Sequence, residues 1–335
     1  MRIAGMQKLT LLDFPGKTAA TVFTPGCNLR CPFCHNGELV AGGAPESGDV
    51  LGNAPGASHT APGNAPDAAP SAAPGNVPNN VSGDAALPFP ELPLDEVLAF
   101  LRKRRGLLDG VCVSGGEPLL QPELAAFCET VRELGYAVKL DTNGTLPDRL
   151  AELLDAGLVN FVAMDVKNAP ERYGETVGMP SFDCGAIRAS IEALVRSGVP
   201  FELRTTVVRE LHEADDLRSL ARWLRAMTAR TCGETDAEEG NQAGSAERPN
   251  GDCRKGGEAA EQDEPAETPK ATSSESDAAT DERENAALWF IQNFKDADTV
   301  LAGCDVLHPW DEDDLRKLLP ELQAILPGAR LRGIG

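Results

Sequence analysis

Short apolar segments that alternate with helical patterns constrain the fold of this chain more than any other feature. Five segments are typical of strands, and they span residues 17–24, 111–114, 137–140, 159–163 and 201–208. Helical patterns span residues 94–105, 122–134, 147–155, 185–197 and 213–228, with a further strand expected at 288–291 and a last helix at 312–325. Alternation of this kind predicts an α/β fold with a parallel sheet and right-handed connections. About six strands are fewer than the eight of a closed barrel, so we expect a partial, open β/α barrel.

Two low-complexity insertions interrupt this alternation. Residues 43–90 contain 11 Ala, 9 Pro and 7 Gly, a composition that buries too little apolar surface to fold. Residues 230–284 hold 16 Asp and Glu against 6 Lys and Arg and show no hydrophobic periodicity. We therefore expect both insertions to be disordered, and the barrel to consist of residues 1–42, 91–229 and 285–335.

The charge and the cysteine content limit the compartment and the partners. A net charge of −21 argues against nucleic acid or an anionic membrane as a partner. The start of the chain carries charged side chains and no apolar signal segment, and no apolar run approaches the roughly 20 residues of a membrane span. Nine cysteines in a chain without a secretory signal indicate a reducing compartment, so we expect the cytoplasm.

Three cysteines follow the first strand in a C-x3-C-x2-C run formed by Cys27, Cys31 and Cys34. Thiolates this close in sequence can hold one iron–sulfur cluster, and three of them leave one iron of a four-iron cluster free for another ligand. There are three alternatives. The first is zinc in a Cys3His site with His35, the second is covalent haem at the C-x-x-C-H run that ends at His35, and the third is purely structural cysteines.

Polar motifs follow the other strands at the same predicted edge of the sheet. They are Gly115-Gly116-Glu117, Asp141-Thr142-Asn143, Asp165-x-Lys167 and Arg204-Thr205-Thr206. Each alone has an ordinary explanation as a turn or a surface ion pair. Because carboxyl ends of parallel strands meet at one edge, the four motifs together predict a site for a nucleotide that carries an amino acid.

These motifs resemble those of radical S-adenosylmethionine (SAM) enzymes, and among them the activating proteins of glycyl-radical enzymes, particularly those of anaerobic ribonucleoside-triphosphate reductase. The matching segments are residues 9–17, 26–36, 105–121, 140–147, 163–167 and 202–208, which cover most of the chain outside the insertions. The two insertions depart from the family pattern. The extra ferredoxin-like cysteine sets of some activases are also missing from the sequence.

The resemblance implies which residues bind the cofactors. Cys27, Cys31 and Cys34 would hold a 4Fe–4S cluster whose open iron binds the amino and carboxylate groups of SAM. The Gly115-Gly116-Glu117 segment would receive the SAM amino group.

Three further residues would lie at the methionine end of SAM. Asp165 and Lys167 would lie at the methionine carboxylate, and Asp141 would lie near the same end. The resemblance also implies a monovalent cation beside Asp141, Thr142 and Asp165.

The adenosine end of SAM would contact Phe33, near the adenine, and Arg204 and Thr206, near the ribose. The implied reaction is reductive cleavage of SAM, followed by formation of a glycyl radical on a partner enzyme, with a flavodoxin- or ferredoxin-type protein as the reductant. A radical SAM enzyme acting on a small molecule or peptide, and a non-catalytic iron–sulfur or zinc protein, are the alternatives. The sequence assigns no role to Cys112, Cys128, Cys184, Cys232, Cys253 or Cys304, although Cys112 and Cys128 fit small core residues.

Overall fold

The structure, a computed structural model, describes residues 1–40, 90–228 and 289–334. The predicted insertions at 43–90 and 230–284 lie outside these ranges apart from Pro90, as do residues 41–42, 229, 285–288 and 335 of the predicted barrel. The disorder of the insertions and the boundaries of the barrel therefore stay predictions. All statements below concern the described residues.

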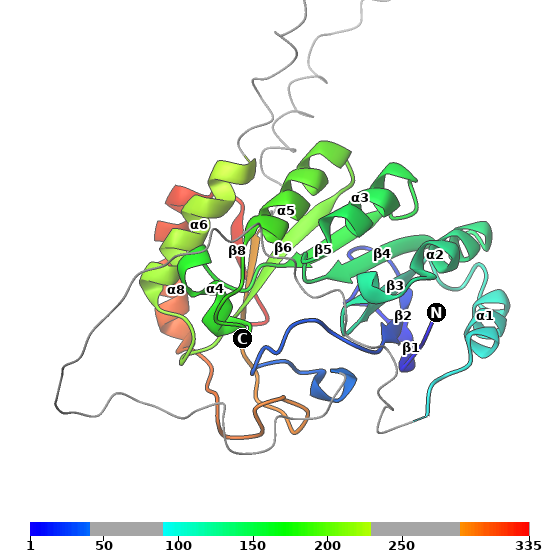
Figure 1. The fold of residues 1–335 in the computed structure, drawn as a ribbon, viewed down its shortest axis with the longest axis horizontal. Helices are drawn as coiled ribbons and strands as arrows, with labels where there is room; N and C mark the ends of the chain where they lie inside the picture. The colour runs from blue at the N-terminus through cyan, green and yellow to red at the C-terminus, as the bar shows by residue number, and fades with distance from the viewer. Residues whose placement is uncertain (41–89, 229–288, 335) are drawn as a thin grey trace, which may run out of the picture. The chain divides into compact units, whose positions relative to one another are not determined.

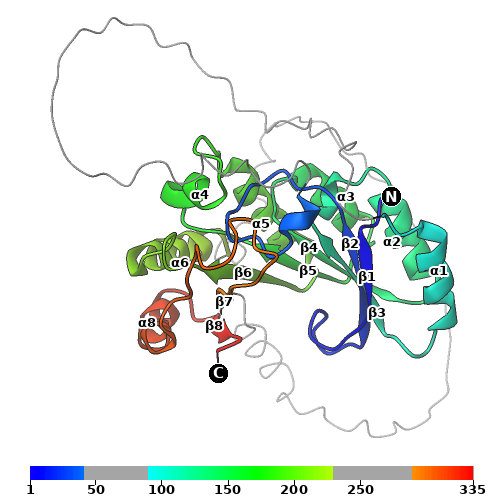
Figure 2. The same ribbon diagram turned by 90° about the horizontal axis from the view of Figure 1, so that it is seen from below.

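One sheet of eight strands forms the centre of the described fold. The strands are β1 (Gly5–Thr10), β2 (Ala19–Thr24), β3 (Gly110–Gly115), β4 (Ala137–Thr142), β5 (Phe161–Asp165), β6 (Phe201–Val207), β7 (Trp289–Asn293) and β8 (Ala329–Arg332). They lie side by side in sequence order, and all neighbours are parallel except β1 and β2. Strands β1 and β8 form the two edges, so the sheet is not closed (Figures 1 and 2). The predicted open, parallel barrel is confirmed.

The strand count differs from the prediction of about six because of the two edge strands. Strand β1 pairs antiparallel with β2 and is not followed by a helix, so it falls outside the strand–helix alternation. Its middle residues Gln7, Lys8 and Leu9 are all exposed, and therefore show no buried–exposed alternation. Strand β8 has only 4 residues. Both strands form because they pair with a neighbouring strand, and neither has a sequence pattern that predicts it.

Seven helices are described, and most lie where their periodicity predicts. They are α1 (Leu94–Lys103), α2 (Leu124–Glu133), α3 (Pro147–Asp155), α4 (Pro170–Thr176), α5 (Gly185–Ser197), α6 (Ala214–Thr228) and α8 (Glu312–Ile325). Helix α4 was not predicted, because 7 residues are too few to show a helical period. Two 3-10 turns, Gly37–Leu39 and Pro118–Leu120, follow the cysteine run and the Gly-Gly-Glu motif.

Local signals explain where the helices begin and end. The Asp311 carboxylate caps α8 by accepting hydrogen bonds from the backbone N–H groups of Asp313 and Asp314. Helix α5 ends at Gly198, whose φ of 68° is a left-handed conformation that glycine adopts without steric cost. Helix α6 buries Leu217, Leu220, Ala221, Leu224 and Met227, which recur at helical spacing on one face.

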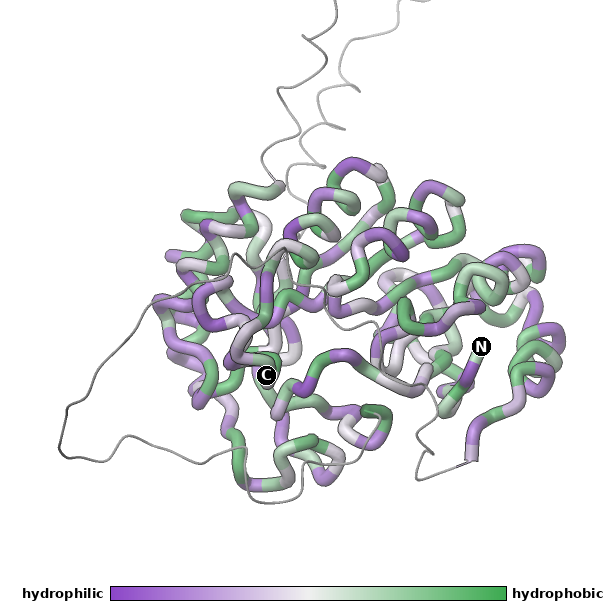
Figure 3. The backbone as a smooth tube through the Cα atoms, viewed as in Figure 1, coloured by the Kyte–Doolittle hydropathy of each residue, from purple (hydrophilic) through white to green (hydrophobic). Residues whose placement is uncertain are grey.

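The helices cover the outer face of the sheet, and this layer contains most of the apolar core. Helix α3 packs on α5, α5 on α6 and α6 on α8, so the helices form a continuous row along the outer face (Figure 1). Apolar and polar residues alternate along each helix, as expected for helices that bury one face (Figure 3). Trp289 of β7 is fully buried, and its indole N–H donates to the Thr205 hydroxyl at 2.9 Å.

The inner face of the same sheet is charged. Residues paired in a parallel register point to the same side, and the pairing places Asp165 next to Arg204, and Lys139 next to Cys112. Ala163 lies between Asp141 and Glu202 on the same face. The Glu202 carboxylate binds Arg332 of β8 through two contacts of 2.9 and 2.6 Å. Charged groups on this face therefore meet opposite charges from adjacent strands, as Asp165 does, or from a strand further along the sheet, as Glu202 does.

Candidate functional site

A pocket of about 200 Å³ that opens to solvent lies at the carboxyl ends of the parallel strands. Twelve of the 13 predicted site residues line it: Cys27, Cys31, Phe33, Cys34, Gly115, Gly116, Asp141, Thr142, Asp165, Lys167, Arg204 and Thr206. Because these residues come from five strand ends, the sheet brings together what the sequence keeps far apart.

The three cysteines enter the pocket from the loop after β2. Gly26, with φ of 88°, turns the chain out of the strand, and its N–H donates to the Leu39 carbonyl at 2.7 Å. The N–H of Cys34 donates to the Cys31 carbonyl at 3.0 Å and closes the turn between the second and third cysteines. The side chain of Asn143 donates to Cys27 Sγ at 3.8 Å and to Asn28 Oδ1 at 3.0 Å, which fixes the first cysteine.

Burial keeps these thiols protonated unless a metal takes the place of the proton. It raises the pKa of Cys27 to about 11 and that of Cys31 to about 12, against a lowering effect of the nearby Lys167 ammonium. The pKa of Cys34 is raised for the same reason. Metal ions bind thiolates and displace their protons, so three cysteines that line one pocket suit an iron–sulfur cluster.

The position of His35 bears on the zinc alternative. Its Nε2 atom lies 2.5 Å from the Lys295 carbonyl, and its ring packs on Phe294 with 5.4 Å between the ring centroids. Nε2 is thus engaged with the segment that follows β7 rather than with the thiols. Within the described ranges, no group of three or more His, Cys, Asp or Glu side chains is arranged to hold a single metal ion.

Residues 299–302, which were not predicted to belong to the site, hydrogen-bond to the cysteine loop. The backbone N–H groups of Leu301 and Ala302 donate to the carbonyls of Cys34 and Pro32 at 3.0 and 2.9 Å. Gly37 approaches the same segment so closely that a Cβ atom there would lie 2.9 Å from the Thr299 carbonyl oxygen. These contacts are between backbone atoms, so no side-chain motif in the sequence predicts them.

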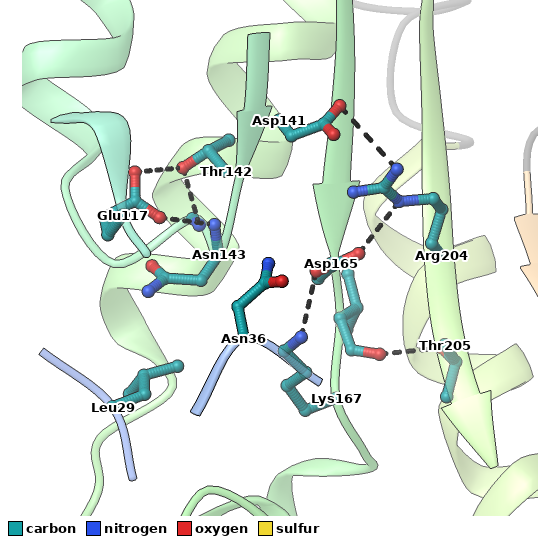
Figure 4. Close-up of polar contacts among 12 residues, drawn as sticks. Leu29, Asn36, Glu117, Asp141, Thr142, Asn143, Asp165, Lys167, Arg204 and Thr205 are labelled. Atoms are coloured by element: carbon teal, nitrogen blue, oxygen red, sulfur yellow. Dashed lines mark hydrogen bonds and ion pairs between the residues drawn. The ribbon is translucent and has the colours of Figure 1, made fainter. Parts of the chain in front are cut away.

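A chain of alternating charges crosses the floor of the pocket (Figure 4). Arg204 donates through Nε to Asp165 at 2.9 Å and lies 3.6 Å from Asp141, and Lys167 donates to the other Asp165 oxygen at 2.9 Å. Asp141 also contacts the buried ammonium of Lys139 and accepts a hydrogen bond from Ser114 at 3.0 Å. The strand register explains the pattern, because Asp165 and Arg204 are direct neighbours on β5 and β6.

The pairing holds these groups in their charged forms. Burial opposes the ionisation of Asp165, but the charges of Arg204 and Lys167 outweigh it and hold the pKa of this carboxyl well below its usual range. Burial likewise disfavours the charge on Lys167, but Asp165 raises the pKa of this ammonium above its ordinary value. The pocket floor therefore presents fixed charges that suit a zwitterionic amino-acid group.

Comparison with known proteins identifies the family. Residues 21–224 match the family model described as the Radical SAM superfamily, a match that covers more than half of the chain. The chain belongs to the radical SAM superfamily. This confirms the resemblance noted in the sequence, and a 4Fe–4S cluster and SAM are accordingly its cofactors. The family also decides against zinc, haem and structural cysteines as explanations of the three-cysteine run.

Relatives within the superfamily differ in what they are named for. A protein of Methanocaldococcus jannaschii that is named as a glycyl-radical enzyme activating enzyme is 26% identical over 67% of this chain and 75% of its own length. The pyruvate formate-lyase-activating enzyme of Clostridium pasteurianum is 25% identical over 67% of this chain and 76% of its own. The 7-carboxy-7-deazaguanine synthase of Methanopyrus kandleri is 34% identical, but over 46% of this chain and 51% of its own.

One predicted residue of this radical SAM chain does not line the pocket. The Glu117 carboxylate is fully buried and accepts hydrogen bonds from the N–H groups of Leu119 and Asn143 and from the Thr142 hydroxyl, at 3.1, 2.7 and 2.8 Å. Burial raises the pKa of Glu117 to about 7, against the lowering effect of these three bonds. Its side chain thus joins the loops after β3 and β4, and only the backbone of the Gly-Gly-Glu motif faces the pocket.

The two glycines of this motif allow it to pack closely against the cysteine loop of the radical SAM pocket. A Cβ atom at Gly116 would lie 1.9 Å from the Gly26 carbonyl oxygen, which no side chain tolerates. The N–H of Gly116 donates to the Thr24 carbonyl and that of Glu117 to the Gly26 carbonyl, at 2.9 and 2.7 Å. The motif therefore lies directly against the start of the cysteine loop.

The residues predicted to contact adenosine, Phe33, Arg204 and Thr206, all line the pocket. Phe33 is buried, with the Lys167 ammonium 5.7 Å from its ring centroid and the His212 ring edge-on at 6.5 Å. His212 Nε2 lies 2.8 Å from the Lys167 carbonyl, so this histidine links the segment after β6 to that after β5. Burial lowers the pKa of His212 and favours its neutral form. His212 was not predicted, since a lone histidine carries no sequence signal.

The remaining structural expectations concern core cysteines and membrane insertion. Cys112 and Cys128 are both 0% exposed, in agreement with their prediction as buried residues. None of the described helices has the length and the apolar character needed to cross a membrane.

Proposed function

We propose that this radical SAM enzyme is an activase that installs a glycyl radical on a partner enzyme, with anaerobic ribonucleoside-triphosphate reductase as the first partner to test. The observation that carries the proposal is the extent of the similarity to two proteins named as activating enzymes. Each alignment covers 67% of this chain and at least 75% of the relative. Similarity over that extent reaches well beyond the short cofactor motifs.

The open sheet supports the same proposal. Strands β1 and β8 do not pair, so the inner face is not enclosed by a complete barrel. A glycine in a partner protein can reach a reactive group only if its own backbone enters the pocket. An incomplete barrel leaves room for a protein loop, whereas a small molecule needs no such opening.

In this proposal the chain's own residues hold and orient the cofactors. Cys27, Cys31 and Cys34 bind the cluster, and the Gly115-Gly116 backbone receives the SAM amino group. Lys167, held by Asp165, pairs with the methionine carboxylate, because an ammonium fixed by one carboxylate can still donate to a second.

The adenosine end follows the same assignment. Phe33 lies at the adenine, and Arg204 and Thr206 lie near the ribose. When bound, the reduced cluster and SAM supply reductive cleavage to methionine and a 5′-deoxyadenosyl radical. The protein contributes by positioning the reactants and by keeping water away from them.

The decisive experiment is an anaerobic incubation of this protein with SAM, a flavodoxin- or ferredoxin-type reductant and a candidate reductase. The expected result is a glycyl-radical electron paramagnetic resonance signal in the reductase. A reductase in which the radical-bearing glycine is replaced by alanine is the matched control and should give no such signal. Formation of 5′-deoxyadenosine without any signal in the partner would overturn the activase proposal. The cytoplasm, where such partners and reductants occur, is the compartment that the proposal requires.

A second candidate function is the modification of a small molecule or peptide. The similarity to 7-carboxy-7-deazaguanine synthase favours it, since the identity of 34% exceeds that to the activating enzymes, although over fewer residues. Turnover of SAM that depends on an added small molecule, with no partner protein present, would support this second function.

A further inference from the structure

The side chain of Lys139 is a buried cation that the proposed cofactor contacts do not use. It lies on β4, is 1% exposed and does not line the pocket. Its ammonium contacts the Asp141 carboxylate and lies 3.9 Å from Cys112 Sγ. An ammonium removed from water is costly unless a charge compensates it, so the contact with Asp141 determines where it sits.

The oxygens of Asp141 are fully engaged by groups of this chain. Oδ1 contacts the Lys139 ammonium and lies 3.6 Å from the Arg204 guanidinium, and Oδ2 accepts a hydrogen bond from Ser114 at 3.0 Å. Asp141 is one of the residues for which the family resemblance implies a monovalent cation. The position beside its carboxylate is already filled by an ammonium.

The other two residues implied in a cation site are engaged as well. Arg204 and Lys167 donate to separate oxygens of Asp165, both at 2.9 Å. The Thr142 hydroxyl donates to the buried Glu117 carboxylate at 2.8 Å. The side chains present therefore fit a potassium or sodium ion poorly, because the Asp141 and Asp165 oxygens that would bind it already face ammonium and guanidinium groups of this chain.

The charge balance of the pocket floor points the same way. Two carboxylates, Asp141 and Asp165, meet three cations, Lys139, Lys167 and Arg204. These five side chains together carry a single excess positive charge. A further cation at this place would be repelled by the three that are already there.

We propose that the Lys139 ammonium takes the place of a bound monovalent cation in this chain, so that SAM binds without potassium or sodium. Lys139 is a positioning residue, since it acts on SAM through Asp141 and Arg204 rather than by contact. The inference concerns cofactor binding alone, so it stands or falls separately from the activase proposal.

The first test compares cations on the unaltered protein. Full-length protein, reconstituted anaerobically with iron and sulfide, is dialysed into choline chloride, potassium chloride or sodium chloride at equal ionic strength. The Kd for SAM is then measured by equilibrium dialysis without any partner protein. We expect the three values to agree within about twofold, since screening is the same in all three salts. Binding that is about fivefold tighter or more in potassium or sodium would overturn the proposal.

The second test removes the ammonium and keeps the length of the side chain. In Lys139→Met, we expect the Kd for SAM in choline chloride to rise about tenfold or more, and potassium or sodium to restore most of the loss. Lys139→Arg keeps the charge and should remain independent of the cation. Lys103→Met, at the exposed end of α1, is the matched control and should behave as the unaltered protein.

The outcomes separate a positioning role from a structural one. A general loss of structure would lower the cluster content of Lys139→Met and would not be reversed by a particular ion, so iron and sulfide are measured in every sample. A Lys139→Met protein that binds SAM in choline chloride as tightly as the unaltered protein would overturn the proposal. If this variant does not fold, the comparison of cations on the unaltered protein still decides.

Discussion

The two faces of the sheet obey different rules, although the same strands build both. The outer face carries apolar residues that pack against α2, α3, α5, α6 and α8, and any residue of similar shape would serve there. The inner face carries charged residues such as Asp165 and Arg204, each of which needs a particular partner on the next strand. Stability and cofactor binding should therefore be separable, and substitutions on each face test this.

The largest effect is expected at the edge where the inner face meets the cysteine loop. Cys31→Ala removes one of three thiolates, so the cluster should be lost and SAM cleavage should fall below detection. Iron and sulfide content and 5′-deoxyadenosine formation are the measurements. Cys128→Ala, which alters a buried cysteine of the outer core, is the matched control and should keep the cluster. Full cleavage by Cys31→Ala would contradict the ligand assignment.

A smaller effect is expected from a charge on the inner face itself. Lys167→Met should weaken SAM binding by about 10- to 100-fold, as a hydrogen bond between charged groups contributes roughly 1.5–3 kcal/mol. Asp165 keeps its contact with Arg204 in this variant, so the thermal midpoint should change little. Equilibrium dialysis and circular dichroism measure the two quantities. A variant that binds SAM normally would show that Lys167 has no role at the carboxylate.

Substitutions on the outer face should lower the stability and leave the affinity for SAM nearly unchanged. Leu224→Ala on α6 removes a fully buried side chain and should lower the free energy of unfolding by about 2–5 kcal/mol, because a cavity remains. The Kd of the surviving folded protein for SAM should stay within about twofold. Arg222→Ala, on the exposed side of the same helix, should change neither quantity by much. A large change in SAM affinity for Leu224→Ala would show that the two faces are coupled.

The smallest effect is expected from Glu117, whose carboxylate joins the loops after β3 and β4. Its pKa is raised to about 7 in the folded protein, whereas an unfolded chain gives the ordinary value of 4.5. The folded state therefore binds the proton more tightly, and this contribution to stability is lost as the pH rises from about 4.5 through 7. The expected loss is about 1–3 kcal/mol. Thermal midpoints of cluster-free protein at several pH values measure this loss of stability. Glu117→Gln should remove the corresponding part of the pH dependence. An identical pH profile in that variant would contradict the assignment.

Sequence patterns were sufficient for features that depend on neighbours along the chain. The periodicity of α6, the glycine that ends α5 and the C-x3-C-x2-C run each act over a few residues, so they are readable without a fold. The order of strands and helices then placed most of the polar motifs at one edge, because parallel strands of this kind leave their carboxyl ends together.

Contacts between distant segments were decided only in the tertiary structure. The sequence shows a glutamate in Gly115-Gly116-Glu117, but only the packing of the loops after β3 and β4 turns its carboxylate away from the pocket. It shows Lys139 as one more residue of a strand, but the register of β3 and β4 brings its ammonium beside Cys112 on the inner face. The physical reason is that a charge inside a protein is governed by its neighbours in space, and residues on adjacent strands are far apart along the chain.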